Sequence, residues 1–441
     1  MPQFTPFSRV RQLRAILEHA ADKKHLTPAQ RHMYASEKQM NFRTIAKLCA
    51  TRSPHQLTTS DLASPDLIVE FSQIGQFAEV VYPSLLPTEV VFENISILTR
   101  ANFPLEGYDA LLEADLVQAW VGDVADLDCL VAYRPKLKQL VVAFSGTANT
   151  KQSLYDIRFR KLRHPAGKGC TVHSGFWKIY KGVKRRALEG IEKGKREHEV
   201  KELVITGHSL GGAISSLLAL DLLTGADVPR TLIQGIKLKI VGFGSPRAGN
   251  AGLVRVWRDA VAERRREEGE DSVVEYLVKA YRDGVPSLPP ASFGYRHFTD
   301  TPLYFYYGRL FHIPPSENEH GLFDVSQDAL DTTRVPEHPR GGHNYYNNRD
   351  MEGIARRMQW IEDMMGKDLD WESTYEERLA KYEAKIAKKL GVSPGSRRSS
   401  SVVSESTLGS SSGNSWTSSS GTLTRSHSDS SLDIGGAAPS S

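Results

Sequence analysis

A serine set between two glycines, directly after an apolar run, is the feature that most constrains the fold of this chain. The stretch ITGHSLGGA covers residues 205–213 and carries the pattern G-x-S-x-G. The run ELVITG predicts a buried strand before the serine, and residues 213–223 predict a helix after it. A serine at so sharp a turn from strand to helix occupies a strained backbone conformation that exposes its hydroxyl to reactants.

The two glycines follow from the close approach of strand and helix at this turn. Side chains at Gly207 and Gly211 would collide there, so the two positions form a nucleophile elbow around Ser209. The N-terminus of the helix also presents free backbone N–H groups beside the serine. We therefore predict that Ser209 is a nucleophile and that the amide of Leu210 donates to an oxyanion. A glycine-rich turn without chemical meaning is the alternative.

A serine nucleophile needs a base, usually a histidine that a carboxylate orients. With this elbow the order along the chain is serine, acid, histidine, so both partners lie beyond residue 209. Asp283 follows the apolar run VVEYLVKAY and precedes a turn at GVP. It is our candidate acid, because parallel strands gather a site at their carboxyl ends, and an ordinary turn aspartate is the alternative. The downstream acids that lack such a strand are Asp300, Asp324, Asp328 and Asp331.

The candidate base lies on a loop late in the chain. Histidines follow Asp283 at positions 297, 312, 320, 338 and 343. The segment GGHNYY offers a suitable loop around His343, because two glycines give it freedom and two tyrosines can pack around the ring. On spacing alone, His338 stays an alternative.

Strands and helices alternate along the middle of the chain. Short β-branched and aromatic runs predict strands, and apolar residues at helical spacing predict helices. Besides the pair that flanks Ser209, the predicted strands cover 116–123, 128–134, 139–146, 238–244 and 273–281, and the predicted helices cover 66–82 and 176–191. The alternation predicts an α/β fold with a mostly parallel central sheet, flanked by helices on both faces.

The outer stretches complete a division of the chain into four parts. Residues 1–65 are polar and basic and predict a helical N-terminal extension before an α/β domain over 66–365. Apolar residues at spacings of three and four predict an amphipathic helix within 366–392, which packs on the core or contacts a partner or membrane. Serine and glycine dominate 393–441 and predict a disordered tail. Its RRSSS and RSHSDSS runs are typical of phosphorylation sites for basic-directed kinases. Short serine–arginine runs also occur by chance, which is the alternative.

Composition excludes several classes of protein. Lys plus Arg number 56 and Asp plus Glu 52, a near balance that argues against a nucleic-acid binder. Three widely spaced cysteines predict free thiols in a reducing compartment, and the sequence contains no metal-site or Walker motif. No window is apolar enough for a membrane span or a secretory signal, so we expect a cytoplasmic protein. A mitochondrial transit peptide is the alternative.

Six motifs in a fixed order resemble those of one known family. One is the elbow GHSLGGA. The other five are AFSGT, VHSGF, GSPRAGN, RDGVPSLPP with the following YRH, and HNYY, and all six lie between residues 117 and 347. On these motifs the chain resembles the class 3 (fungal) lipases of the α/β-hydrolase fold. The resemblance implies that Ser209 is the nucleophile, that Asp283 holds the histidine and that His343 is the base.

The same resemblance assigns the oxyanion hole and a lid. The residue after the F-x-G turn, Thr147, would donate its amide and hydroxyl together with the amide of Leu210. A lid often follows, here 148–161, and its mixed apolar and basic character suits one, although an ordinary surface connection is the alternative. This stretch lacks the N/D-W pair common in such lids. The segment 299–340 is longer than the family leads us to expect, and either covers an acyl pocket or decorates an edge.

The resemblance implies a serine carboxylester hydrolase that cleaves acylglycerols or related lipid esters through an acyl-enzyme, without metal or other cofactor. Its partners would be the lipid ester and, peripherally, the surface of a lipid droplet or membrane. In the family pattern His173 and His297 are structural. Two alternatives remain: an esterase of the same fold for soluble, feruloyl-type esters, and a non-catalytic lipid-binding or scaffold protein.

Overall fold

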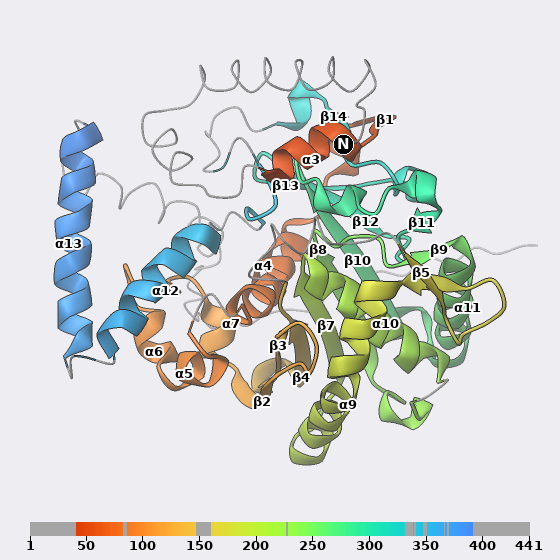
Figure 1. The fold of residues 1–441 in the computed structure, drawn as a ribbon, viewed down its shortest axis with the longest axis horizontal. Helices are drawn as coiled ribbons and strands as arrows, with labels where there is room; N and C mark the ends of the chain where they lie inside the picture. The colour runs from red at the N-terminus through yellow and green to blue at the C-terminus, as the bar shows by residue number, and fades with distance from the viewer. Residues whose placement is uncertain are drawn as a thin grey trace, which may run out of the picture. The chain divides into compact units, whose positions relative to one another are not determined.

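A computed structural model describes residues 41–82, 86–146, 160–225, 228–330, 338, 341–346, 351–365, 367 and 370–390 (Figure 1). The helices are α3 (Asn41–Cys49), α4 (Pro65–Val80), α5 (Thr88–Glu93), α6 (Ile95–Leu98), α7 (Asp109–Leu112), α9 (Ser174–Glu197), α10 (Leu210–Thr224), α11 (Ala251–Glu268), α12 (Met351–Met365) and α13 (Trp371–Leu390). The strands are β1 (Arg52–Leu57), β2 (Asp115–Val121), β3 (Asp128–Arg134), β4 (Gln139–Phe144), β5 (Lys161–Arg163), β6 (Thr171–His173), β7 (Glu202–His208), β8 (Lys237–Phe243), β9 (Gly249–Asn250), β10 (Val273–Ala280), β11 (Tyr295–Arg296), β12 (Pro302–Tyr306), β13 (Arg309–His312) and β14 (Leu322–Val325).

The centre of the fold is an eight-stranded sheet in the order β13-β12-β10-β8-β7-β4-β3-β2. The strands from β4 to β12 pair in parallel, and antiparallel strands lie at both edges. Parallel neighbours need crossovers, which the helices between these strands supply. The predicted α/β fold with a mostly parallel sheet is therefore confirmed.

Both faces of this sheet are covered, which explains why whole strands are apolar. Every residue of β4 is buried. Its alternate residues Leu140, Val142 and Phe144 join a core cluster with side chains of α9, α10 and α11. From the opposite face, Phe243 of β8 meets Phe71 of α4, with ring centroids 6.3 Å apart. Helix α4 therefore covers the face opposite to α10, as Figure 1 also shows.

The N-terminal stretch does not form helix alone. Helix α3 is followed at once by β1, which pairs in parallel with β14 far along the chain. The prediction of a helical extension over 1–65 is wrong at β1, because RSPHQL lacks apolar residues at helical spacing and finds a distant strand partner instead. Residues 1–40 lie outside the described residues.

The long stretch 299–340 begins with a hairpin at the sheet edge. Strands β12 and β13 pair antiparallel, and the turn between them places Tyr307 at φ 55° and Gly308 at φ 76°. Two successive positive φ angles are typical of the turns that match the twist of a hairpin. The sequence left two alternatives for this stretch, a cover over an acyl pocket and a decoration of a sheet edge. The start of the stretch lies at an edge of the central sheet.

Several smaller predictions concern the ends and the thiols. All three cysteines lie in described segments and none forms a disulfide. Helix α13 lies within the predicted C-terminal helix, and it crosses from one compact unit, Met1–Glu377, into another that begins at Arg378. The tail predicted over 393–441 lies outside the described residues. No helix in the ranges given above combines the length and the apolar character needed to cross a bilayer.

Burial of α10 on all sides makes its core residues sensitive to truncation. We expect Leu217→Ala to lower the free energy of unfolding by about 2–5 kcal/mol, because Leu217 is fully buried and its neighbours cannot close the cavity. Urea denaturation measures the change. Leu137→Ala, at an exposed position, is the control and should stay within about 0.5 kcal/mol of wild type. Equal losses in the two variants would contradict the placement of α10.

Candidate active site

Ser209 lies at the junction of β7 and α10 in a backbone conformation that residues other than glycine rarely adopt. Its φ is 59° and its ψ is −126°. The amide of Ser209 donates to the carbonyl of Phe243 at the end of β8, 2.9 Å away. Such a conformation costs on the order of 1–3 kcal/mol and persists only where the surroundings enforce it. The serine is 4% exposed.

The glycines on either side of Ser209 allow β7, α10 and the end of β4 to come together. A Cβ on Gly207 would lie 2.6 Å from the carbonyl oxygen of Gly211. A Cβ on Gly211 would lie 2.7 Å from the carbonyl carbon of Phe144. Contacts this short do not occur in folded proteins, so either side chain would push the helix away from the strand.

Asp283 is a buried hub of hydrogen bonds in the turn after β10. It is 1% exposed, and its Oδ1 accepts from the amide of Val285 at 2.8 Å. Its Oδ2 accepts from Nδ1 of His343 at 2.9 Å and from the hydroxyl of Tyr346. Both oxygens are therefore engaged, as a buried carboxylate requires.

The contact with Asp283 fixes the tautomer of His343. Because a carboxylate can only accept, Nδ1 carries the proton and Nε2 is left with a free lone pair. Nε2 is buried and has no hydrogen-bond partner within the described ranges. An imidazole in this state can take up a proton. The runner-up, His338, instead stacks on Tyr345 with ring centroids 4.5 Å apart.

His208 connects the elbow to the loop of His343. Its Nε2 donates to the carbonyl of His343 at 2.7 Å, so its Nδ1 accepts from the hydroxyl of Tyr82 at 2.7 Å. The rings of His208 and His343 lie 4.3 Å apart between centroids. Burial, followed by the charge on His343, lowers the pKa of His208 well below its ordinary value and keeps this ring neutral. The residue before Ser209 therefore touches the loop that carries His343.

The predicted oxyanion hole and lid are described only in part. Leu210 is the first residue of α10, and its amide is one of those that a helix leaves without an internal partner. Thr147 and the predicted lid residues 148–159 lie outside the described residues. Gly146, the residue before Thr147, does lie beside the elbow, since a Cβ there would stand 3.1 Å from Cβ of Ser209.

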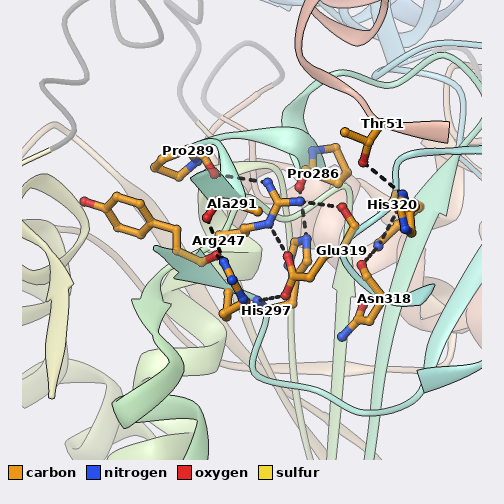
Figure 2. A network of polar contacts seen from close by, with 12 residues as sticks. Thr51, Arg247, Pro286, Pro289, Ala291, His297, Asn318, Glu319 and His320 are labelled. Carbon is orange, nitrogen blue, oxygen red and sulfur yellow. Dashed lines mark hydrogen bonds and ion pairs between the residues drawn. The ribbon is translucent and has the colours of Figure 1, made fainter. Parts of the chain in front are cut away.

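A buried guanidinium supports the turn that carries Asp283 (Figure 2). Arg247, 3% exposed in its side chain, donates to the carbonyls of Pro289 at 3.0 Å and Glu319 at 2.7 Å, and pairs with the Glu319 carboxylate. Its backbone amide also donates to the carbonyl of Leu288 at 2.7 Å. Arg247 thus ties the segment after Asp283 to a turn of the long stretch 299–340.

Two further buried groups complete this network. Nε2 of His297 donates to the carbonyl of Pro286 at 2.9 Å, and the amide of His297 donates to Glu319 at 3.0 Å. Lys279, near the end of β10, donates to the carbonyls of Asn318 and His320. Burial, with Arg247 adding to it, lowers the pKa of Lys279 to about 7. His297 and His173 are both buried, and His173 caps α9 at the amide of Phe176, which agrees with structural roles.

No cluster of three or more His, Cys, Asp or Glu side chains arranged to hold a metal ion occurs within the described part of the chain. The groups that the structure does gather are a strained serine, a paired imidazole and carboxylate, and a helix N-terminus. Such an arrangement on a mostly parallel sheet defines the α/β-hydrolase class of fold.

Comparisons with known proteins show which family part of the chain resembles. Residues 141–293 match the family model described as lipase (class 3). A lipase of Rhizomucor miehei is 27% identical over 202 residues, which cover 46% of this chain and 52% of that protein. The secreted mono- and diacylglycerol lipase MDL3 of Malassezia globosa is 30% identical, over 43% of this chain and 60% of that protein. The solved lipase II from Rhizopus niveus gives a TM-score of 0.49 at 20% identity, over 66% of this chain and 97% of that one.

The family model and these relatives confirm the resemblance to the class 3 lipases that the motifs of the chain predict. The chain spans about half the length of the first curated relatives it matches, 52% of the Rhizomucor protein and 49% of a secreted mono- and diacylglycerol lipase of Fusarium solani. The expectation of a cytoplasmic protein is corrected by this comparison, because relatives from Fusarium, Penicillium and Malassezia are named as secreted.

Sequence reasoning did not single out three residues of the site, and only the first of them carries a signal that could have identified it. His208 stands within the elbow motif itself, where a ring next to the nucleophile invites attention. Tyr82 ends a predicted helix 126 residues before His208, and only the folded chain brings them together. Phe42 lies in a polar, basic stretch, and its ring centroid is 4.5 Å from that of His343.

Loss of the carboxylate of Glu319 should leave the buried guanidinium uncompensated. We expect Glu319→Gln to lower the free energy of unfolding by about 3 kcal/mol, because one buried charge then lacks its partner. Chemical denaturation measures it. The control is Asp324→Asn in the exposed pair with Arg52, expected to change stability by at most about 1 kcal/mol. A loss no larger than that of the control would contradict the network.

Burial of Lys279 should also give stability a dependence on pH. Between about pH 7 and its ordinary pKa of 10.5, the unfolded chain holds a proton on Lys279 that the folded chain releases, so rising pH favours the folded state. We expect wild type to gain stability relative to Lys279→Met across this window. Denaturation midpoints at several pH values measure the difference. Parallel curves for the two proteins would show that Lys279 stays charged in the fold.

Proposed function

We propose that the protein is a serine carboxylester hydrolase with Ser209 as nucleophile, His343 as base and Asp283 as the group that orients the base. The single observation that carries this proposal is the buried hydrogen bond of 2.9 Å between Asp283 and Nδ1 of His343, whose carbonyl accepts from His208, the residue before the strained Ser209. The match of residues 141–293 to the class 3 lipase model supports it. Gly207 and Gly211 serve this function by allowing the elbow to form.

The reaction follows from the protonation states. Nε2 of His343 takes the proton of Ser209 as Oγ attacks the ester carbonyl, and Asp283 stabilises the imidazolium. The resulting oxyanion accepts from the amide of Leu210 and, in our proposal, from Thr147. Loss of one such donor costs on the order of 10²–10³ in kcat in comparable enzymes. The imidazolium protonates the departing alcohol, and a water activated by His343 then releases the acid from Ser209.

We propose acylglycerols or related lipid esters as substrates. Relatives named as lipases and as mono- and diacylglycerol lipases support this class. Two finer proposals go with it: a lid formed by residues 148–161 over the acyl pocket, and contact with a lipid surface. Phosphorylation of the serine-rich segment 393–441 is a third, and that segment lies outside the described residues.

The nucleophile is tested by labelling and by turnover together. We expect a fluorophosphonate to label Ser209 in wild type and not in Ser209→Ala, because only the activated oxygen attacks phosphorus. Asp283→Asn should lower kcat by about 10⁴-fold, because the amide favours the wrong tautomer of His343. A folded wild-type protein without labelling or ester hydrolysis would support the alternative of a non-catalytic lipid-binding protein.

The substrate class is tested on one preparation. We expect hydrolysis of emulsified long-chain acylglycerols at a rate that exceeds that of soluble short-chain and feruloyl esters, because a lipase-type site binds an apolar chain. Released fatty acid, titrated at constant pH, gives the rate, and Ser209→Ala is the blank. Preference for the feruloyl ester would replace the lipid proposal with that of a soluble-ester esterase.

A further inference from the structure

Helix α3 lies against both loops that carry the proposed acid and base. At one end of the contact the backbone of α3 meets Gly284, the residue after Asp283. At the other, Phe42 and Arg43 meet the segment that contains His343. This helix belongs to the stretch predicted as an extension outside the α/β domain, and its position suggests a part in the chemistry.

The contact with the acid turn leaves no room for a side chain. A Cβ on Gly284 would lie 2.6 Å from the carbonyl oxygen of Phe42 and 2.7 Å from Cβ of Ile45. The backbone of Gly284, with φ −88° and ψ −17°, is one that any residue adopts. Glycine is therefore required at this position by the approach of α3 and not by the turn itself.

The contact with the base loop fixes both its backbone and its ring. Nε of Arg43 donates to the carbonyl of Gly341 at 3.1 Å, two residues before His343. The ring of Phe42, 4% exposed, packs on the imidazole of His343 with a centroid distance of 4.5 Å and an interplanar angle of 42°. Gly341 and Gly342 both have positive φ, so the loop depends on outside contacts for a single conformation.

Helix α3 is itself anchored just beyond its end. The carbonyl of Thr51 accepts from the amides of Gly321 at 3.1 Å and Leu322 at 3.2 Å. Strand β1 then pairs with β14. Helix α3 is thus fixed close to its C-terminal end and packs tightly on Gly284. It is therefore suited to hold the loops of Asp283 and His343 at a constant distance from each other.

We propose that α3 clamps the acid and base loops together and that Phe42 is a positioning residue for the imidazole of His343. The inference rests on the proposed function, in which His343 is the base. Phe42 packs on the ring of His343, and in this proposal it acts through His343. Loss of the clamp lets the imidazole turn away from Ser209 while the substrate site stays intact.

The test compares three variants with the wild-type protein, each as the 441-residue chain. Phe42→Leu removes the ring, and we expect kcat to fall by about 10- to 100-fold with KM unchanged, because a small displacement of a catalytic group has effects of this size. Phe42→Tyr keeps the ring and should retain kcat within about threefold of wild type. The matched control is Phe103→Leu, a buried phenylalanine that packs on Tyr375 and should leave kcat unchanged.

A second variant keeps the proposal testable if Phe42→Leu fails to fold. Gly284→Ala leaves the turn its backbone conformation but displaces α3, so we expect the same loss of kcat at constant KM. A rise in kcat in either variant would mean that α3 is a cover over the site, and a rise in KM alone would mean that Phe42 binds substrate. Either result overturns the clamp, as does a loss equal to that of Phe103→Leu.

A measurement that does not depend on catalysis tests the contact between α3 and His343 separately from the proposed hydrolase function. The ring protons of His343, assigned by comparison with His343→Gln in histidine-labelled protein, should shift when Phe42→Leu removes the neighbouring aromatic ring. If wild type neither reacts with a fluorophosphonate nor hydrolyses esters, the proposed function fails while this shift still tests the contact. Unchanged His343 resonances in Phe42→Leu would overturn the clamp even in an active enzyme.

Discussion

The buried carboxylate of Asp283 is the interaction on which the site depends. A charge with 1% exposure is tolerated only when each oxygen is matched by donors, and here three donors come from two places in the chain. The amide of Val285 lies in its own turn, whereas His343 and Tyr346 lie on a loop about sixty residues away. Satisfying this one group therefore draws the late loop onto the sheet and sets the tautomer of His343. The network around Arg247 then holds the turn from the other side.

The central sheet was predictable because its signals are local. Runs such as QLVVAF and LKIVGF have no helical period and are buried on both faces, so each identifies a strand without knowledge of its neighbours. The elbow is equally local, since strand, glycines, serine and helix are contiguous. The choice between His343 and His338 was not settled by spacing, because it depends on which ring reaches Asp283.

The remainder of the structure depends on contacts that no local pattern encodes. Strand β1 has a polar sequence, and it is a strand only because β14 lies beside it. The turn at residues 317–320 contains no motif, yet it supplies Glu319 to Arg247 and two carbonyls to Lys279. Thr147 follows directly from a family motif, but its placement lies outside the described residues. Sequence alone thus identified the groups proposed to react more readily than those that hold them in place.

The pairing of β1 with β14 has a consequence for the order of folding. Arg52 and Asp324 form an ion pair across a separation of 272 residues. Contacts so distant along a chain form late, because a large loop must close before they contribute any stability. During synthesis on a ribosome, strand β1 must wait until its partner β14 has emerged, 272 residues after Arg52 at Asp324. The parallel sheet and its elbow can assemble in that interval, so helix α3 is expected to dock onto an already formed sheet as one of the final steps of maturation.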